Sequence, residues 1–549
     1  MVFEIRDRDL LARIGRIRTK SGIVETPTLL PVINPAREVI KPKEMETIFG
    51  CEAVITNAYI VKRNFNESAI KMGIHKLLNF NGVIMTDSGA YQILTYGNIE
   101  ITPEEVIKYQ EDIDSDIATI LDIPTGWKVS KDYAKYTVEE TIRRAEKLPK
   151  LKKRDDILWV GPIQGGRYLD LIALSAKKMG SLPFQIHALG SPTPVMEQYL
   201  FHILVDMILT AKMNLPPDRP FHLFGAGHPF MFSLAVALGC DLFDSAAYSI
   251  YARDNRYMTE YGTIRLSRLE YLPCSCPVCS KRTVKDLMDM PIDERIVELS
   301  RHNLYMCLSE VRRIKQAIVE GRLWEYVEMR AHGHPSLLQA LKHLDKYSRY
   351  IERHTPITKR SGLFFFGSID LNRPEVIRHR RRLMERYRPP EEAKILILVP
   401  EVDADSQKRL NLHKEVSRLI RKGFGEDAIY KFHVCTYGSP FGLIPMELKE
   451  VYPLSQYEAA LPLDRSFDEH TVDMVTDYVR AGSYYAVVVL WFPCDLGQEV
   501  SEVCRNICLK KEIKFRDVPL RRGLDKDSSR RLMDVLSSFY IPKEREGDQ

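Results

Sequence analysis

The sequence predicts an α/β protein whose first part is a TIM (β/α)8 barrel, followed by smaller α/β domains. Short apolar, β-rich runs recur eight times over about 250 residues, which is the count and length of such a barrel. Several of the segments between the runs have helical patterns, and most runs end at a polar residue or a glycine. A doubly wound sheet is the alternative fold, because counting strands in one sequence is error-prone.

The predicted strands are Thr28–Ile33, Glu52–Thr56, Gly82–Thr86, Ile117–Leu121, Ile157–Ile163, Phe184–Leu189, Phe221–Phe224 and Cys240–Phe243. Between them, Thr102-Pro-Glu-Glu105 supplies an N-cap, a proline at the first helical position and acids that favour the helix dipole. Thr137 and Glu140 have capping-box spacing, and residues 194–213 have a long helical pattern.

In a barrel, the residues just past the strand ends form the active face. The residues expected there are Asn57, Asp87, Asp122, Gln164, Gly190, Gly225 and Asp244.

A chain of 549 residues is too long for one compact core, so we expect at least two domains. The first is a barrel at 1–355, including a zinc-binding subdomain at about 270–350 with helices from 285 to 353. Residues 355–362 have the composition of a linker, and 363–549 are expected to form one or two α/β domains, RNA-binding or accessory. Their expected elements are buried strands at 394–400 and 484–492 and a helix at 528–538.

The composition is that of a soluble globular protein, with 45% hydrophobic and 28% charged residues. The net charge of +5 is too small to indicate a polyanionic partner by itself. The N-terminus is charged and no apolar run is long enough to cross a bilayer, which predicts a cytoplasmic protein without a membrane partner. The ten cysteines are mostly scattered, which favours a reducing compartment over a disulfide framework.

Cys274, Cys276 and Cys279 place three thiols within six residues, and His302 follows 23 residues later. Three thiolates and one imidazole form a closed tetrahedral zinc site, which is typically structural. The sequence therefore predicts one structural Zn²⁺ ion. The alternatives are a chance cluster of core cysteines and, for His302, a hydrogen-bonded core histidine on a helix.

Asp87 and Asp244 each follow a predicted buried strand, and two carboxylates at one barrel mouth suit substitution at an anomeric carbon. One would attack C1′ to form a covalent glycosyl–enzyme, while the other moves the proton of the base. Either aspartate could instead form or cap a turn. The same pair also fits a retaining glycosidase.

Asp122 and Gln164 also follow strands, and a carboxylate with an amide matches the hydrogen-bonding edge of a guanine-like base. Gln164 could instead bond loop backbone. A cluster of arginines could bind phosphates, or it could simply be a solvated helix face. Its members are Arg378, Arg380, Arg381, Arg382, Arg386 and Arg388, and Arg521 and Arg522 follow later in the chain.

Taken together, these segments resemble tRNA-guanine transglycosylases of the archaeal type, the archaeosine tRNA-ribosyltransferases. The resemblance covers about residues 1–350 and is specific because the motifs occur in family order. The motifs are Thr86-Asp-Ser-Gly-Ala-Tyr-Gln92, Asp122-Ile-Pro124, Gly161-Pro-Ile-Gln-Gly-Gly166, His187-Ala-Leu-Gly190, Phe243-Asp-Ser245, Tyr251-Ala-Arg-Asp-Asn-Arg-Tyr-Met258 and Cys-x-Cys-x-x-Cys at 274–279 with His302-Asn-Leu-Tyr305.

The resemblance implies a pentosyltransferase that replaces guanine at position 15, in the D-arm of archaeal tRNA, with 7-cyano-7-deazaguanine (preQ0), the first tRNA-level step of archaeosine biosynthesis. It implies Asp244 as the nucleophile and Asp87 as the general acid/base, with the reverse assignment also open.

The resemblance also implies roles for other residues of these motifs. Asp122, Gln164, Ser88 and the backbone of Leu189 and Gly190 would contact the base. Tyr91 would stack on it, with core packing as the alternative. Arg253 and Arg256 would approach the RNA, or else simply belong to an exposed loop.

Relatives also suggest a homodimer. Archaeal members usually finish with a PUA domain, whereas a helical pattern stands at 528–538 here, so a separate PUA-domain protein is an expected partner. Other functions considered are an archaeosine synthase-like paralogue that acts on preQ0-tRNA and a non-catalytic, zinc-bearing tRNA-binding subunit. Asp87 and Asp244 argue against both, since such proteins are expected to lack the catalytic carboxylates.

Overall fold

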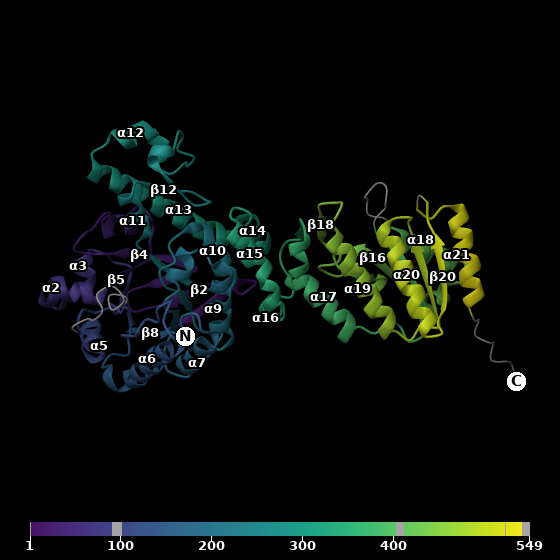
Figure 1. Ribbon diagram of the computed structural model, residues 1–549, viewed down its shortest axis with the longest axis horizontal. Coiled ribbons are helices and arrows are strands. Elements are labelled where there is room, and N and C mark those ends of the chain that lie inside the picture. Colours follow the sequence, from purple (N-terminus) through teal and green to yellow (C-terminus); the bar gives the residue numbers. More distant parts are fainter. Residues whose placement is uncertain (1, 91–100, 402–410, 522, 541–549) are drawn as a thin grey trace. The chain divides into compact units, whose positions relative to one another are not determined.

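The computed structural model describes residues 2–90, 101–401, 411–521 and 523–540. The chain divides into two compact units, Met1–Lys359 and Arg360–Gln549 (Figure 1). Among the described residues, no helix combines the length and the apolar character that crossing a bilayer requires.

The first unit is built on a closed barrel of eight parallel strands, which confirms the predicted fold and excludes the doubly wound sheet for this part of the chain. Each of the eight predicted segments overlaps one strand, and the strands follow one another around the ring in chain order. They are β4 (Thr28–Ile33), β5 (Ala53–Asn57), β6 (Val83–Asp87), β7 (Ile117–Thr119), β8 (Leu158–Ile163), β9 (Ile186–Leu189), β10 (Phe221–Leu223) and β11 (Leu242–Ser245).

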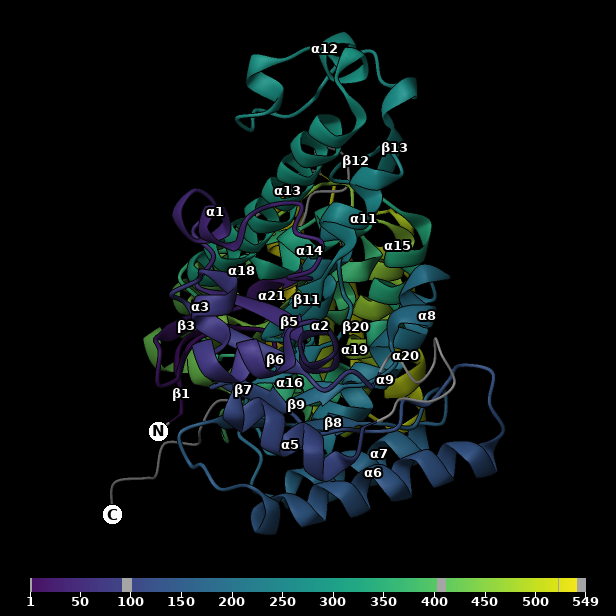
Figure 2. The same ribbon diagram turned by 90° about the vertical axis from the view of Figure 1, so that its left-hand side faces the viewer.

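Helices lie outside the strands; Figure 2 shows α5, α6 and α7 along the outer surface of the barrel. The helices that connect successive strands are α1 (Pro42–Thr47), α2 (Ala58–Met72), α3 (Ile74–Leu78), α5 (Pro103–Asp112), α6 (Lys131–Leu151), α7 (Leu169–Gly180), α8 (Thr193–Glu197), α9 (Phe201–Met213) and α10 (Phe232–Ala237).

The predicted helix start at Thr102 is confirmed, because Thr102 and Glu105 form a reciprocal capping box at the beginning of α5. The predicted start at Thr137 is wrong. Ser130 caps α6, and Thr137 lies inside that helix, where its hydroxyl donates to the carbonyl of Ala134 at 2.7 Å. The helical pattern of residues 194–213 is also interrupted, since Tyr199 adopts a positive φ of 57° between α8 and α9.

An antiparallel sheet of three strands, which the sequence analysis did not predict, precedes the barrel. Its apolar residues Phe3, Ile17 and Val24 belong to the same buried cluster as barrel residues such as Leu30 and Val83. The sheet therefore helps to fill the barrel core. Its strands are β1 (Phe3–Asp9), β2 (Ala12–Arg18) and β3 (Ile23–Thr26).

Alternation along the strands determines which side chains reach the mouth of the barrel. Ile55, Met85 and Leu242 lie in the core cluster. Because side chains alternate between the two faces of a strand, the residues two positions further on face the same interior. Those residues are Asn57, Asp87 and Asp244, each at or next to the carboxyl end of its strand.

After the barrel, the chain forms a small subdomain and then a group of helices. Figure 2 shows α12 and the turns around it at the end of α13 that lies away from the barrel strands. The elements of this region are α11 (Ala247–Arg253), β12 (Arg256–Met258), β13 (Thr263–Arg265), α12 (Val284–Asp289), α13 (Ile292–Glu320), α14 (Leu323–Ala331), α15 (Pro335–Lys342) and α16 (Ser348–His354).

The second unit contains a five-stranded sheet in the order β17-β16-β15-β19-β20, in which only β17 is antiparallel, and a two-stranded sheet of β14 and β18. Helices α18 and α21 contribute to the apolar cluster on one face of the larger sheet, and α19 and α20 to that on the other. The strands are β14 (Leu363–Phe365), β15 (Ile395–Pro400), β16 (Phe432–Ser439), β17 (Gly442–Pro445), β18 (Tyr457–Ala459), β19 (Ala486–Trp491) and β20 (Lys514–Pro519). The helices are α17 (Pro374–Glu385), α18 (Leu412–Phe424), α19 (Arg465–Ala481), α20 (Asp495–Lys510) and α21 (Lys526–Phe539).

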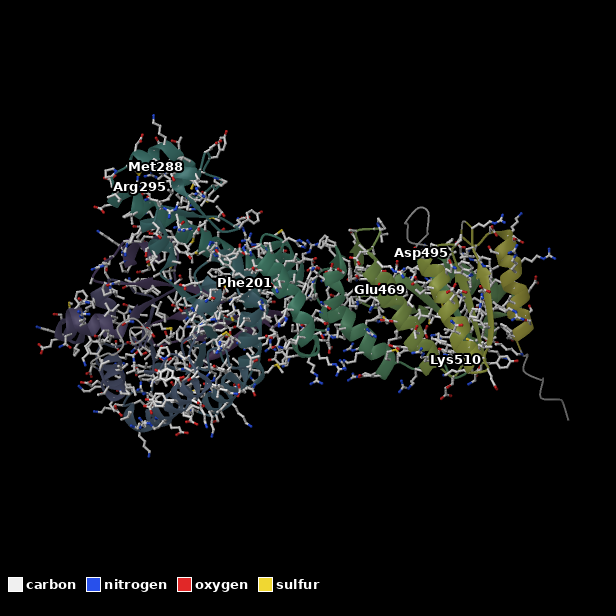
Figure 3. All side chains as sticks on the ribbon, viewed as in Figure 1. Phe201, Met288, Arg295, Glu469, Asp495 and Lys510 are labelled. Carbon is white, nitrogen blue, oxygen red and sulfur yellow. The ribbon has the colours of Figure 1, made fainter. Side chains whose placement is uncertain are left out.

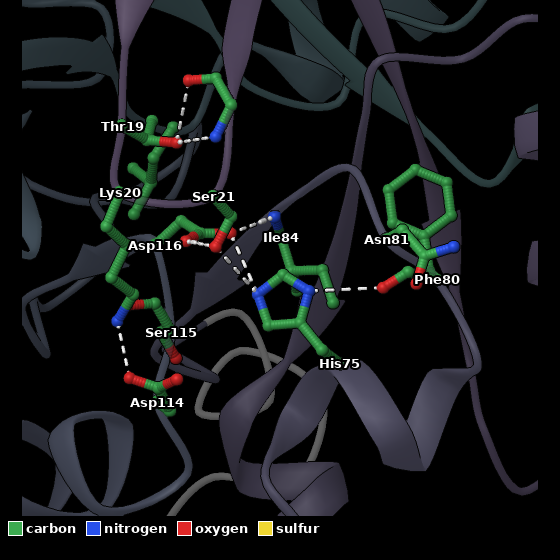
Figure 4. A network of polar contacts seen from close by, with 12 residues as sticks. Thr19, Lys20, Ser21, His75, Phe80, Asn81, Ile84, Asp114, Ser115 and Asp116 are labelled. Atoms are coloured by element: carbon green, nitrogen blue, oxygen red, sulfur yellow. Dashed lines mark hydrogen bonds and ion pairs between the residues drawn. The ribbon is translucent and has the colours of Figure 1, made fainter.

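A polar network joins the β2–β3 turn to the amino ends of the barrel strands (Figure 4). The fully buried Asp116 accepts hydrogen bonds from Ser21 Oγ at 2.5 Å and from the backbone N–H of Ile84 at 2.8 Å. His75 Nε2 lies 3.1 Å from Asp116, and its Nδ1 lies 3.1 Å from the carbonyl of Phe80. Asp116 and the carbonyl of Phe80 are acceptors, so the imidazole satisfies both only when both ring nitrogens carry a proton. The Ser21 hydroxyl, which lies 3.3 Å from Nε2, already donates to Asp116.

Replacing His75 should destabilise the barrel most at low pH. Burial opposes the charged imidazole, but the hydrogen bond and the charge of Asp116 outweigh it, and the pKa of His75 is raised. The stabilisation is therefore complete below the unfolded-state pKa of about 6.5 and is lost as pH rises through the folded-state pKa. At pH 6 we expect His75→Gln to cost about 1 kcal/mol, or about 2 °C in calorimetric Tm.

Thr19→Ala is the control, since it removes hydrogen bonds to Gly22 in the same turn and leaves the contacts of His75 and Asp116 in place. Its loss of Tm should be similar at pH 6 and pH 9, whereas that of His75→Gln should shrink. A deficit of His75→Gln that stays constant over this range would show that the charged imidazole contributes nothing.

Candidate active site and metal centre

Asp87 lies at the carboxyl end of β6, next to Asn57 at the end of β5. The two residues are paired in the sheet register, and Asn57 Nδ2 donates to Asp87 Oδ2 at 3.1 Å. The backbone N–H of Gly89 lies 3.3 Å from the same oxygen. Gly89 has a φ of +91°, and a Cβ there would lie 2.5 Å from Cβ of Tyr59. Only glycine fits this turn, which orients the carboxylate.

Asp244 lies on β11, and one of its two carboxylate oxygens is held by two donors. Oδ1 lies 2.9 Å from His222 Nε2 and accepts the backbone N–H of Gly225 at 3.0 Å. Because the carboxylate can only accept, His222 Nε2 carries the proton. Within the described part of the chain, Oδ2 receives no hydrogen bond. The carboxylate is thus fixed in orientation while one oxygen remains open to a reacting atom.

The three aspartates at the barrel mouth interact electrostatically. Burial, followed by the charges of Asp122 and Asp244, raises the pKa of Asp87 to about 7. Near neutral pH, Asp87 can therefore hold or release a proton. Two neighbouring carboxyl groups in different protonation states are the equipment for combined acid and nucleophilic chemistry.

Asp122 and Gln164 follow the neighbouring strands β7 and β8 and form a buried pair, in which Gln164 Nε2 donates to Asp122 Oδ2. Gln164 Oε1 accepts from the backbone N–H of Thr125 at 2.9 Å, so loop backbone does orient this amide. Burial raises the pKa of Asp122 to about 6, although the hydrogen bond from Gln164 lowers it. The pair offers a fixed acceptor and an amide to a planar polar ligand.

Leu189 ends β9 and is fully buried, and Gly190 follows it. A Cβ on Gly190 would lie 2.2 Å from Gln164 Nε2, so the absence of a side chain there leaves room for the amide. Ser88 is fully buried, and its hydroxyl accepts the N–H of Ala90 at 3.4 Å, which stabilises the turn after Asp87. Tyr91 lies outside the described residues.

Arg253 and Arg256 follow β11 closely. Arg253 is exposed at the last turn of α11, and the half-buried Arg256 donates to the hydroxyl of Thr263 at 3.1 Å. Both lie in the segment between Asp244 and the cysteine cluster.

The four predicted metal ligands come together. The ligand atoms of Cys274, Cys276, Cys279 and His302 all lie within 4.8 Å of one another. His302 Nδ1 lies 3.5 Å from Cys276 Sγ and 3.3 Å from Cys279 Sγ. Bond lengths of about 2.3 Å to sulfur and about 2.0 Å to nitrogen give a tetrahedral edge of about 3.5 Å, so the donor set fits one ion.

The surroundings of His302 favour this role. Its Nε2 lies 2.9 Å from the carbonyl of Met258, which leaves Nδ1 to face the thiols. The ring of Tyr257 stacks on the imidazole with a centroid distance of 3.6 Å. Metal-binding histidines generally use the ring nitrogen that does not bind the metal to donate a hydrogen bond, for example to a backbone carbonyl, and this bond orients the ring. These residues could hold a metal ion.

Two residues beside the acids were not predicted as site residues. His222 lies within the apolar sequence Phe-His-Leu-Phe and is fully buried, so its sequence pattern is that of a core histidine. Asn57 was expected at the carboxyl end of a barrel strand, but no catalytic or binding role was predicted for it. The signal that identifies both is their position on strands next to those of Asp244 and Asp87, which becomes visible once the strand order is known.

Comparisons with known proteins agree with this architecture. A family model described as queuine tRNA-ribosyltransferase matches residues 8–336, and a model described as a domain of unknown function matches residues 376–536. The chain is 45% identical over 464 residues to the tRNA-guanine(15) transglycosylase of Pyrobaculum aerophilum, covering 84% of this chain and 90% of the relative.

Proteins with the same name from two other organisms are also similar. The one from Saccharolobus solfataricus is 44% identical over 498 residues, covering 89% of this chain and 96% of the relative. The one from Methanocaldococcus jannaschii is 42% identical over 493 residues, covering 87% and 72%. The family predicted from the sequence motifs is therefore confirmed. The chain belongs to the queuine tRNA-ribosyltransferase family and is an enzyme of the pentosyltransferase class.

Proposed function

We propose that this enzyme replaces guanine at position 15, in the D-arm of tRNA, with preQ0, through a covalent ribosyl–aspartate intermediate. The observation that carries the proposal is the group of three acids at the barrel mouth. Asp244 has one oxygen fixed and one open, and Asp87 has a pKa of about 7 beside it. The names of the relatives supply the tRNA position.

In the first half of the reaction, Oδ2 of Asp244 attacks C1′ of the ribose and the C1′–N9 bond breaks. The electron pair of that bond goes to guanine, which takes a proton from Asp87 and leaves. In the second half, preQ0 gives its N9 proton to Asp87 and attacks C1′, and the bond from C1′ to Asp244 breaks. Two inversions give net retention at C1′, and no redox or nucleotide cofactor is consumed.

Asp122 and Gln164 would recognise the base, with Asp122 accepting N–H groups of the guanine-like ring and the backbone of Leu189 and Gly190 contacting its edge. Ser88 would support the turn beside it, and Tyr91 would stack on the ring. Because Asp122 is buried and Gln164 donates to only one of its oxygens, a base without matching donors would leave part of its hydrogen-bonding capacity unused, which gives strong discrimination.

The proposed assembly follows from the same assignment. Arg253 and Arg256 would contact the tRNA backbone near the barrel mouth, and the Cys₃His cluster would hold one structural Zn²⁺ ion. The remaining proposals are that the enzyme acts as a homodimer in the cytoplasm, that a separate PUA-domain protein supports tRNA binding, and that residues 363–549 form an RNA-binding or accessory domain.

Asp244→Asn should abolish base exchange and leave tRNA affinity within about twofold, because it removes the nucleophile and keeps the shape. The measurement is incorporation of radiolabelled preQ0 into unmodified tRNA, together with a binding titration. Asp254→Asn, an exposed change after α11, is the control and should retain activity.

The same variants test which aspartate attacks. Enzyme incubated with tRNA without preQ0 and separated on a denaturing gel should show a covalent adduct for the native sequence and, in smaller amount, for Asp87→Asn, but none for Asp244→Asn. An adduct in Asp244→Asn but none in Asp87→Asn would reverse the two roles, and full exchange activity in Asp244→Asn would reject the mechanism.

The pH profile of guanine release should be bell-shaped. Asp122 must be ionised to accept from the base, so the rate should fall as pH drops below about 6. Asp87 must be protonated to release guanine, so the rate should also fall as pH rises above about 7. Single-turnover release of labelled guanine between pH 5 and 9 measures both limbs. Asp254→Asn should keep both, and a flat profile would contradict the assigned roles.

Metal analysis should find one zinc ion per chain, and Cys276→Ser should lose it. Chelation should make residues 266–302 sensitive to proteolysis and lower the Tm, since a closed site contributes to folding. Cys494→Ser, which alters a half-buried cysteine outside the cluster, should keep the zinc content and Tm of the native protein. A metal-free protein of unchanged stability would refute the zinc assignment.

A further inference from the structure

A basic groove lies between α18 and the segment that follows β17 in the second unit. Its cavity volume is about 640 Å³. Helix α18 supplies most of the lining, and the turns on either side of strands β16 and β17 supply the rest. The lining residues are His413, Lys414, Ser417, Arg418, Arg421, Lys422, Glu426, Met446, Lys449 and Glu450.

The lining is strongly positive, because it contains five lysines and arginines against two glutamates, a net charge of +3. His413 does not add to this charge at neutral pH, since burial and then the charges of Lys449 and Lys414 lower its pKa to about 4. His413 Nδ1 is buried without a hydrogen-bond partner among the described residues. The residue lines the groove as a neutral, buried imidazole.

The cations of α18 recur on one side of the helix. Lys414, Arg418 and Lys422 are spaced four residues apart, so they are neighbours on the helix surface. Like charges at this spacing cost about 0.2–0.5 kcal/mol per pair in an isolated helix. All three are exposed, and among the described residues no carboxylate lies within 4.0 Å of Arg418 or Lys422. Arg418 and Lys422 are therefore available to an anionic ligand.

We propose that this groove binds consecutive phosphates of an RNA strand. From Lys414 to Lys422 the helix rises about 12 Å. Phosphates of one strand follow at about 3.4 Å along a duplex axis, so the row of cations spans about three of them. The lining residues include no Phe, Tyr or Trp, and the imidazole of His413 is buried, so the groove suits backbone contacts that position the RNA without reading its sequence.

The arginine-rich helix α17 is a weaker candidate for the same task. Arg378 is buried, Arg380 pairs with Asp477 at 3.3 Å, and Arg381 pairs with Glu385 at 3.7 Å. These guanidinium groups already have protein partners. Although α17 has the more basic sequence, its arginines already form contacts within the protein, whereas Arg418 and Lys422 of α18 do not form ion pairs in the described structure.

The identity of the RNA as tRNA rests on the proposed function, whereas the groove itself rests only on the geometry and charge of the second unit. The two can fail separately. If the enzyme exchanges no base but the variants below still alter RNA binding, the groove stands and the proposed function fails.

The first test neutralises the cations that lack a carboxylate partner, in the full chain. Arg418→Gln/Lys422→Gln should weaken binding of an unmodified tRNA transcript about tenfold at 0.1 M salt. The plot of log K against log salt should become less steep by about 1.5, because each lost phosphate contact removes about 0.7–0.9 from the slope. At saturating tRNA, kcat for base exchange should be unchanged while KM rises.

A matched control removes two cations from the other side of the sheet. Arg480 lies in the last turn of α19 and Lys510 ends α20, in the helices on the opposite face from α18 (Lys510 is labelled in Figure 3). Arg480→Gln/Lys510→Gln changes the net charge by the same amount. It should leave the affinity and the salt slope as they are.

The second test should strengthen binding, which a misfolded variant cannot do. Glu426 lies 3.2 Å from Arg421, and Glu450 lies 3.7 Å from Lys414. Glu426→Gln/Glu450→Gln frees both cations and raises the net charge of the lining from +3 to +5. We expect tighter tRNA binding and a steeper salt slope.

Unchanged tRNA affinity and salt slope in both double variants would overturn the proposal. Inorganic phosphate and ATP distinguish a small-molecule site from an RNA site. Micromolar binding of either by the native protein, lost in Arg418→Gln/Lys422→Gln without any change in the tRNA slope, would also overturn it.

Discussion

The chemistry depends on keeping three carboxyl groups together where water is scarce. Like charges at such a place repel strongly, so each group needs its own compensation. Asp122 receives a hydrogen bond from Gln164, and Asp244 receives two on one oxygen. Asp87, which has the weakest donors, takes up a proton near neutral pH instead. The unequal compensation of three similar side chains gives them different chemical roles.

The position of Asp244 depends on a residue three places earlier at the opposite end of the strand. Asp241 is fully buried, pairs with Arg13, and accepts the backbone N–H of Phe221 at 2.8 Å. This contact fixes the start of β11 against the start of β10, and the next residue of β10 is His222. A structural ion pair at the amino ends of the strands thus sets the register that brings His222 to Asp244.

Sequence patterns predicted the eight barrel strands because strands buried on both faces are short, continuous apolar runs. They predicted the positions of the aspartates for the same reason, since each follows such a run. They did not predict the role of His222, because a buried histidine that holds a carboxylate has the same local sequence as one that only packs. Thr137 was misassigned because capping-box spacing also occurs inside a helix, and Ser130 provides the actual cap. Contacts between distant strands carry the missing information.

An acidic barrel mouth is a poor place to attract a polyanion. At pH 7 partial protonation of Asp87, whose pKa is raised to about 7, lowers the negative charge at the mouth. Salt screens the remaining negative charge beyond about 8 Å. The mouth can therefore tolerate a nearby phosphate backbone but contributes little affinity for it. Affinity for RNA therefore has to come from cations, such as the proposed contacts of Arg253 and Arg256 and the groove along α18. Arg418 and Lys422, which have no carboxylate partner in the described structure, are suited to supply part of it.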